Sequence, residues 1–215
     1  MSAPEVRTVE QLAGWPVPVI VSSLVPGDAL EPGAGPPPVW AAVGAELVRL
    51  HQAPPAAVPG GLRRFRQHDA VDPGPMVDRL GAQGRLSAAT GQRLWRLRDQ
   101  LAPAALPDRQ QVFCHGDLHA GNVIAREGRL SGLVDFAGAG WLDTAWDFVG
   151  VPSIALEPLL TGYQQAGGVL EGLPERIVWC RLQLAVHRLA DVTDVEGDAV
   201  AAAGQAAALL ALFRI

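Results

Sequence analysis

The 215-residue sequence contains no lysine, so all 17 of its basic side chains are arginines. A site that needs the compact ammonium group of lysine cannot form within this chain, because the planar guanidinium of arginine is a poor geometric replacement. The arginines also form no long run; the nearest approach is Arg63-Arg64-Phe65-Arg66, in a chain of net charge −5. A dedicated nucleic-acid surface is therefore not expected.

Cysteine and long apolar runs are also scarce. Cys114 and Cys180 lack the spacing of a metal site and lie in apolar stretches, which favours buried free thiols. The N-terminus has no basic region leading into a long apolar core, which argues against a signal peptide. The Ala-rich segment 199–212 is interrupted by Gly204 and Gln205 and is too short to span a bilayer. We therefore expect a cytoplasmic protein that does not enter a membrane.

Hydrophobic periodicity indicates a mostly helical body that carries a small β insertion. Residues 17–24 are rich in β-branched side chains and predict one strand, followed by a Pro/Gly-rich hinge at 31–38. Further strands are expected at 111–114, 123–125 and 130–134, and a loop at 60–75. Apolar spacing typical of helices occurs at 39–51, 76–80, 86–101, 143–150, 156–167, 173–192 and 195–213.

The most informative motif runs from His115 to Asn122 and reads His-Gly-Asp-Leu-His-Ala-Gly-Asn. An apolar segment, Leu133-Val134-Asp135-Phe136, follows it, so that Asp135 comes 13 positions after Asn122. This arrangement is typical of phosphoryl-transfer enzymes, in which one Asp orients a hydroxyl nucleophile while an Asn and a second Asp hold magnesium. Taken singly, Asp117, Asn122 and Asp135 could each be an ordinary loop or cap residue; their joint spacing favours the chemical interpretation.

Together with the segment Asp143-Thr144-Ala145-Trp146-Asp147-Phe148, these motifs resemble the aminoglycoside phosphotransferase/choline kinase family. Leu24-Val25-Pro26-Gly27 is similar to the family's segment after the interlobe hinge, and the resemblance extends from residue 17 to the end. It implies an α+β, protein-kinase-like fold. Residues 36–215 would form its mostly helical C-terminal lobe, with small strands carrying the catalytic loop, and residues 1–35 a remnant of the N-terminal lobe and hinge.

The resemblance also implies roles for individual residues. Asp117 matches the catalytic base, and Asn122 and Asp135 match the Mg²⁺ ligands, with ATP or GTP as the phosphate donor. His115, His119, Asp143 and Asp147 match positions that support the catalytic loop, and we expect Asp147 to be buried because its neighbours are apolar. A weaker similarity makes Ser22, Ser23 and Leu24 the hinge that contacts the nucleotide.

The sequence departs from the family upstream of the hinge. About twenty residues precede it, enough for little more than one strand, and no lysine is present to anchor the nucleotide phosphates. A reduced phosphotransferase is one interpretation, acting on a hydroxyl of a small molecule such as an aminoglycoside-like metabolite, or on a peptide Ser/Thr. An inactive pseudokinase that serves as a binding subunit, and one half of a split kinase, are the others. Because the β-rich lobe that normally covers the hinge is missing, we expect an apolar patch around Val19, Val21 and Leu24 that binds a partner chain or mediates self-association.

Two further patterns keep alternatives open. His115-x-Asp117-x-His119 mimics the ligand spacing of a binuclear metallohydrolase, but the remaining histidines at 51, 68 and 187 are scattered along the sequence. The acidic residues Asp191, Asp194, Glu196 and Asp198 could recognise a cationic substrate or simply form a solvated helix junction.

Overall fold

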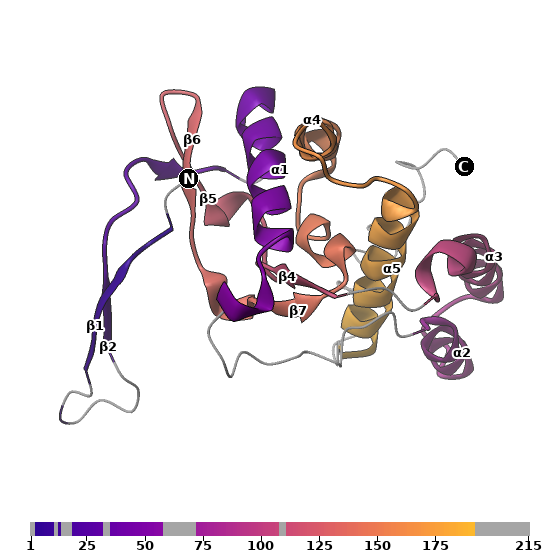
Figure 1. Ribbon diagram of the computed structural model, residues 1–215. Coiled ribbons are helices and arrows are strands. Elements are labelled where there is room, and N and C mark those ends of the chain that lie inside the picture. Colours follow the sequence, from indigo (N-terminus) through magenta and orange to yellow (C-terminus); the bar gives the residue numbers. More distant parts are fainter. Residues whose placement is uncertain are drawn as a thin grey trace. The chain divides into compact units, whose positions relative to one another are not determined.

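The computed structural model describes residues 3–10, 13, 19–31, 35–57, 72–107 and 111–191 (Figure 1). The chain forms two compact units that alternate along the sequence. Unit 1 comprises Met1–Gln52, His115–Ala139 and Gly150–Gly168, and unit 2 comprises Ala53–Cys114, Gly140–Val149 and Val169–Ile215. Among the described residues, no helix combines the length and the apolar character that a membrane span requires.

The strands of unit 1 form two antiparallel sheets. β1 (Val6–Glu10) pairs with β2 (Val19–Ser22) in a two-stranded ribbon, with an irregularity between Val6 and Thr8. β3 (Asp28–Ala29), β5 (Val123–Arg126) and β6 (Arg129–Leu133) form a three-stranded sheet in the order β3-β5-β6. The N-terminal segment thus forms two strands where the sequence predicted little more than one, because the β-branched residues of 6–10 pair with β2.

Two helices of unit 1 pack at unusually short distance because each presents a glycine to the other. α1 (Pro37–His51) begins with prolines in its first turn, where their missing N–H groups are not needed. It packs on α4 (Ser153–Gln165), and a Cβ on Gly44 would lie 2.1 Å from the Leu159 carbonyl oxygen. A Cβ on Gly162 would lie 1.9 Å from the carbonyl oxygen of Ala41. Only glycine permits this approach.

The helices of unit 2 are α2 (Gly74–Ala82), α3 (Ala88–Ala105) and α5 (Leu173–Asp191). The side chain of Ser87 caps α3 by accepting a hydrogen bond from the Thr90 backbone at 3.1 Å. The three helices contact one another through a shared apolar core. Its buried members are Val77, Leu80, Leu94, Leu97, Leu101, Leu173, Ile177 and Trp179.

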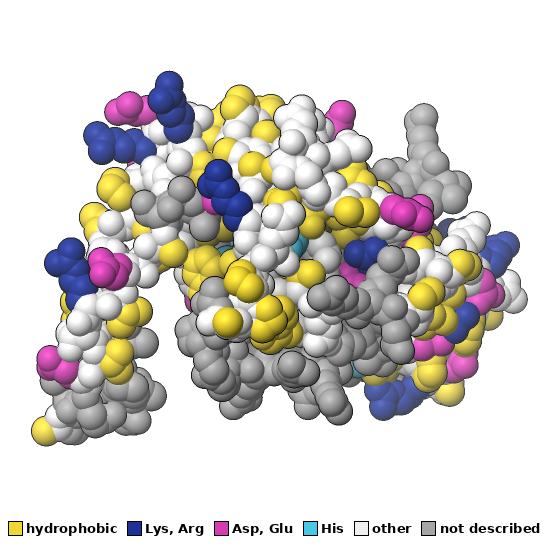
Figure 2. Space-filling view, viewed as in Figure 1, with side chains coloured by type: hydrophobic (Ala, Val, Ile, Leu, Met, Phe, Trp, Pro, Cys, Tyr) yellow, Lys and Arg dark blue, Asp and Glu magenta, His cyan; other side chains and the backbone are white. Residues whose placement is uncertain are grey.

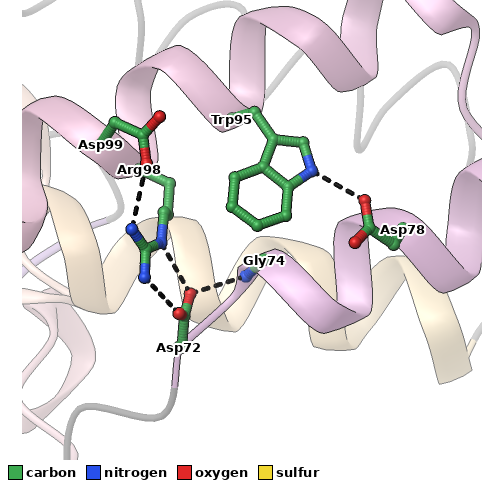
Figure 3. A network of polar contacts seen from close by, with 6 residues as sticks. All are labelled: Asp72, Gly74, Asp78, Trp95, Arg98 and Asp99. Atoms are coloured by element: carbon green, nitrogen blue, oxygen red, sulfur yellow. Dashed lines mark hydrogen bonds and ion pairs between the residues drawn. The ribbon is translucent and has the colours of Figure 1, made fainter.

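A polar network on α2 and α3 surrounds Arg98 (Figure 3). Its guanidinium pairs with both carboxylate oxygens of Asp72, one of them at 3.0 Å, and with Asp99 at 3.0 Å. The guanidinium also lies 5.6 Å from the ring centre of Trp95, whose indole N–H donates to Asp78. Hydrogen bonding to Arg98 holds the pKa of Asp72 below its ordinary value.

Short segments of unit 2 complete the fold. β4 (Val112–Cys114) pairs antiparallel with β7 (Gly140–Leu142), and a 3-10 helix, η5 (Thr144–Phe148), follows β7. The sequence predicted an ordinary helix over 143–150 and no strand at 140–142, because three residues are too few to produce a periodic pattern. The two-residue strand β3 was missed for the same reason. The expected helix at 195–213 and the acidic residues 194–198 lie outside the described residues.

The other expected helices and strands are present. Most of the loop expected at 60–75 lies outside the described residues, and its last two positions belong to α2, as the last two of the hinge expected at 31–38 belong to α1. Helices are found at the predicted ranges 39–51, 86–101, 156–167 and 173–192, with small shifts at their ends. Strands are found at 112–114, 123–126 and 129–133. Cys114 and Cys180 are buried free thiols, as predicted. The proposed division at residue 35 stays a prediction.

Candidate functional site

The loop from His115 to Asn122 is fastened by a buried histidine. The Nε2 atom of His115 lies 2.8 Å from the Val134 carbonyl oxygen, and its Nδ1 atom lies 3.3 Å from the backbone nitrogen of Asp117. A carbonyl only accepts and a backbone N–H only donates, so a neutral ring protonated at Nε2 satisfies both contacts. His115 therefore joins the start of the loop to the residue that precedes Asp135.

Asn122 closes the loop, and backbone contacts orient its side chain. The amide Nδ2 donates to the Asp117 carbonyl oxygen at 2.9 Å, and the Asn122 backbone nitrogen donates to the His119 carbonyl oxygen at 3.0 Å. The Val134 backbone nitrogen donates to the Asn122 carbonyl oxygen at 3.0 Å. Because the amide nitrogen faces the loop backbone, the amide oxygen lies at the other end of the same planar group, and oxygen is the atom that a cation binds.

Asp135 follows β6 in a left-handed backbone conformation, with φ 61° and ψ 64°. Such a conformation costs on the order of 1–3 kcal/mol for most non-glycine residues and is tolerated best by Asn and Asp. The carboxylate caps the 3-10 helix η4 (Phe136–Gly138) by accepting from the Ala137 backbone at 3.4 Å, and the side chain remains exposed. This capping contact explains why an Asp fits at this position. The carboxylate also remains accessible to solvent.

The backbone of the loop packs directly against η4. A Cβ on Gly116, which has φ 81°, would lie 2.0 Å from the Gly138 carbonyl oxygen, and one on Gly138 would lie 3.3 Å from the Asp117 Cβ. Asp117 itself is exposed. The structure therefore brings Asp117, Asn122 and Asp135 to the same end of the β5–β6 hairpin. The convergence of their oxygens on one metal-sized space stays a prediction.

His119 differs from His115 in its surroundings. It is exposed, and its Nε2 atom lies 3.9 Å from a carboxylate oxygen of Asp117, a loose contact that attracts only when the ring is protonated. His119 thus lies beside the predicted base on the surface of the loop, whereas His115 makes the buried backbone contacts.

The segment 143–149 of unit 2 is held by two arginines of α5. Asp143 caps η5 by accepting from the Ala145 backbone at 2.8 Å and also pairs with the Arg176 Nε at 3.1 Å. Arg181 donates to the carbonyl oxygens of Val149 at 3.1 Å and Phe148 at 3.0 Å. Asp147 is fully buried within η5, as its apolar neighbours indicated. Its bracing role stays a prediction.

Sequence reasoning missed Arg176 and Arg181. Both are buried, and burial lowers the pKa of Arg181 because it disfavours the charged guanidinium. The available signal was an arginine within an apolar helical stretch, Ile177-Val178-Trp179-Cys180-Arg181-Leu182. A charged residue at such a position needs a partner, but the sequence does not say which one.

The predicted hinge residues lie where the β1–β2 ribbon ends. Ser23 donates its backbone N–H to the Glu5 carbonyl oxygen at 2.8 Å and accepts the Glu5 N–H on its hydroxyl at 2.8 Å, so it joins the two strands. Leu24 is 88% exposed and Val21 47%. Val6 and Val9 of β1 are also more than half exposed, and hydrophobic side chains are visible along this ribbon in Figure 2. Contact of Ser22, Ser23 and Leu24 with a nucleotide stays a prediction.

Comparison with known proteins identifies the family of this chain. The profile of the phosphotransferase enzyme family matches residues 1–179. The chain belongs to that family. The match reaches the first residue, whereas the motifs alone supported a resemblance only from residue 17. None of the curated proteins matches the chain.

Solved structures agree on the fold of this phosphotransferase family member. A choline/ethanolamine kinase family protein from Mesorhizobium loti is 20% identical with a TM-score of 0.65, over 99% of this chain and 75% of that one. Macrolide 2'-phosphotransferase type I is 22% identical with a TM-score of 0.60, over 98% of this chain and 72% of that one. A mutant of the aminoglycoside phosphotransferase APH(4)-Ia, in a ternary complex with AMP-PNP and hygromycin B, is 16% identical with a TM-score of 0.62, over 97% and 76%. The chain is shorter than these relatives and has the mixed α+β fold of their C-terminal part, as predicted.

Proposed function

We propose that this phosphotransferase family member transfers the terminal phosphoryl group of a nucleoside triphosphate to a hydroxyl of a small molecule. The observation that carries the proposal is the loop geometry, in which Asp117, Asn122 and Asp135 come from two segments that lie at the same end of the β5–β6 hairpin. An aminoglycoside-like metabolite fits the relatives best, because solved relatives are complexes with streptomycin, spectinomycin and hygromycin B. A peptide Ser or Thr is the less favoured acceptor.

The donor set suits Mg²⁺. Magnesium prefers oxygen ligands and is usually held by one or two carboxylates together with substrate phosphates. The exposed Asp135 carboxylate and the amide oxygen of the buried Asn122 offer such oxygens, and bound Mg²⁺ would neutralise charge on the phosphates during transfer. Asp117 would accept a hydrogen bond from the acceptor hydroxyl, orient its oxygen toward the phosphorus and take its proton as transfer proceeds. Its exposure permits direct contact with an acceptor.

A second function, a nucleotide-binding or scaffold subunit without catalysis, is favoured by the absence of lysine. Without a lysine against the phosphates, nucleotide affinity depends on the metal and on backbone donors. We therefore expect weak binding of Mg-ATP by the chain alone, and stronger binding when a partner chain supplies the missing contacts.

Manganese binding tests whether the proposed metal site exists. Electron paramagnetic resonance of Mn²⁺ with ADP should show binding by the wild type, and Asp135→Asn should weaken it by about tenfold or more because one charged ligand is lost. Asparagine tolerates the left-handed conformation and can still cap η4, so the backbone stays intact. Glu127→Gln is the matched control, since Glu127 is an exposed carboxylate in the β5–β6 turn. Equal affinity in all three proteins would exclude the proposed metal site.

Turnover separates the enzyme from the binding subunit. ATP consumption should be measured with kanamycin, spectinomycin and choline as acceptors, for the wild type and for Asp117→Asn. A general base contributes about 10²–10⁴-fold, so the variant should lose turnover by that factor and keep its Mn²⁺ affinity. Mn²⁺ and nucleotide binding without any turnover dependent on Asp117 would establish the scaffold function instead.

The β1–β2 ribbon is the surface at which we propose a partner chain or a second copy to bind. A two-stranded ribbon is marginally stable by itself in water, and this one exposes Val6, Val9, Val21 and Leu24. Sedimentation velocity should therefore detect self-association that Val9→Glu and Val21→Glu weaken. Tight Mg-ATP binding by a protein that remains monomeric would contradict the need for a partner.

A further inference from the structure

Two arginines of α5 contact the two ends of η5. At the start of η5, the Arg176 Nε atom lies 3.1 Å from Asp143 Oδ1, the same oxygen that caps the helix. At its end, Arg181 donates two hydrogen bonds, to the carbonyl oxygens of Phe148 and Val149. Arg176 and Arg181 thus form a clamp around η5, which encloses the buried Asp147.

Both arginines of the clamp are buried, so their contacts differ from ordinary ion pairs on the surface. Arg176 is 8% exposed and Arg181 is 6% exposed. Removing a guanidinium from water is costly unless acceptors satisfy its N–H donors. For Arg181, the carbonyl oxygens at the end of η5 are such acceptors. An arginine paired with a carboxylate on the surface would add little stability and would not need to be buried.

The segment held by the clamp continues directly into the β4–β7 ladder. β7 ends at Leu142, one residue before Asp143, and pairs with β4 in the register Val112 to Leu142 and Cys114 to Gly140. The Cys114 thiol also lies 3.7 Å from the Asp143 carbonyl oxygen. The clamp, η5, β7 and β4 therefore form one connected structure within unit 2.

Both segments that carry the predicted metal ligands are covalently attached to this ladder. β4 continues from Cys114 into His115 and the loop that bears Asp117 and Asn122. β7 begins at Gly140, five residues after Asp135. The Cys114–Gly140 pair is thus the last rung before the chain diverges into the two ligand-bearing segments.

We propose that Arg176 and Arg181 are positioning residues that set the spacing of these two segments, and with it the affinity of the metal site, by holding η5 and the β4–β7 ladder. The inference rests on the proposed function for its metal readout. It extends that function to two residues of α5 that contact the segment 143–149.

Hydrogen–deuterium exchange tests the clamp without any ligand. In Arg176→Gln and in Arg181→Met, amides in 112–122 and 135–142 should exchange about tenfold faster, as expected when hydrogen bonds to a charged group are lost. Peptides from α1 and α4 should be unchanged. Arg188→Met is the matched control, because Arg188 is an exposed arginine of the same helix. Unchanged exchange at 112–122 in both variants would overturn the proposal.

The metal readout distinguishes positioning from general stabilisation. At a temperature well below unfolding, both variants should bind Mn²⁺ about tenfold more weakly, the effect usual for residues that orient metal ligands. Arg181→Lys should recover part of the affinity, since lysine can still donate to both carbonyls. A lowered melting temperature with wild-type Mn²⁺ affinity would overturn the proposal. If the wild type fails to bind Mn²⁺, the metal site is refuted and the exchange result alone decides the clamp; if Arg181→Met does not fold, Arg176→Gln and Arg181→Lys carry both measurements.

Discussion

Replacing Gly162 with alanine perturbs the closest contact between two helices in unit 1. The added Cβ would lie 1.9 Å from the Ala41 carbonyl oxygen, whereas ordinary van der Waals contact begins at 3.4 Å. Both sides of this contact are backbone, so a change of rotamer cannot relieve it. The helices α1 and α4 must therefore move apart by more than an ångström, and the reciprocal contact at Gly44 opens with them.

The cost follows from what this interface buries. Separation loosens side chains of both helices that are almost inaccessible to water, namely Val39, Trp40, Val43, Leu47, Leu159 and Tyr163. Overpacking a core costs about 1–3 kcal/mol and more when the backbone must shift. We expect a loss near the upper end, about 3 kcal/mol, which for a chain of this length lowers the melting temperature by about 6–12 °C.

Thermal unfolding followed by circular dichroism measures this loss. Gly91→Ala in α3 is the matched control, because a Cβ there would meet nothing within 4 Å. Alanine is the better helix former, so the control should gain about 0.5–1 kcal/mol. If the two units unfold separately, Gly162→Ala should shift only one transition. A melting temperature for Gly162→Ala equal to that of the wild type would refute the close-packing argument.

Three further predictions concern buried and paired groups. Asp147→Ala should lower the free energy of unfolding by about 1–3 kcal/mol, because groups around a buried carboxylate lose their partner; an unchanged melting temperature would refute the bracing role. Arg98 lowers the pKa of Asp72 in the folded state, so this pair stabilises the protein above pH 3.8 and the contribution is lost as the pH falls through the folded-state pKa. The urea stability of the wild type should thus exceed that of Asp72→Asn by less than about 1 kcal/mol at pH 7, and this difference should close in acid; a difference independent of pH would contradict the assignment. Cys114 and Cys180 should react with a thiol reagent only on unfolding, since burial raises both pKa values, and rapid labelling of the native protein would count against this.

The catalytic motif and the longer helices could be inferred from the amino-acid sequence because their signals are local. Helical spacing of apolar residues indicated α1, α3, α4 and α5, since each helix buries one side of a repeating pattern. The loop from His115 to Asn122 and the position of Asp135 indicated the family, which the family profile confirms. Burial of Asp147 followed from its apolar neighbours alone.

Only the tertiary structure revealed the features that depend on contacts between distant residues. The strand β7 has too few residues for a pattern and is defined by its pairing with β4, and β1 is recognised as a strand by its pairing with β2. Gly44 and Gly162 are unremarkable in sequence, and their role appears only when two helices separated by a hundred residues approach within contact of their backbones. Arg176 and Arg181 could be flagged as charges in an apolar helix, but their partners in 143–149 lie more than thirty positions away. Local periodicity carries no record of such partners, because they are chosen by packing across the fold.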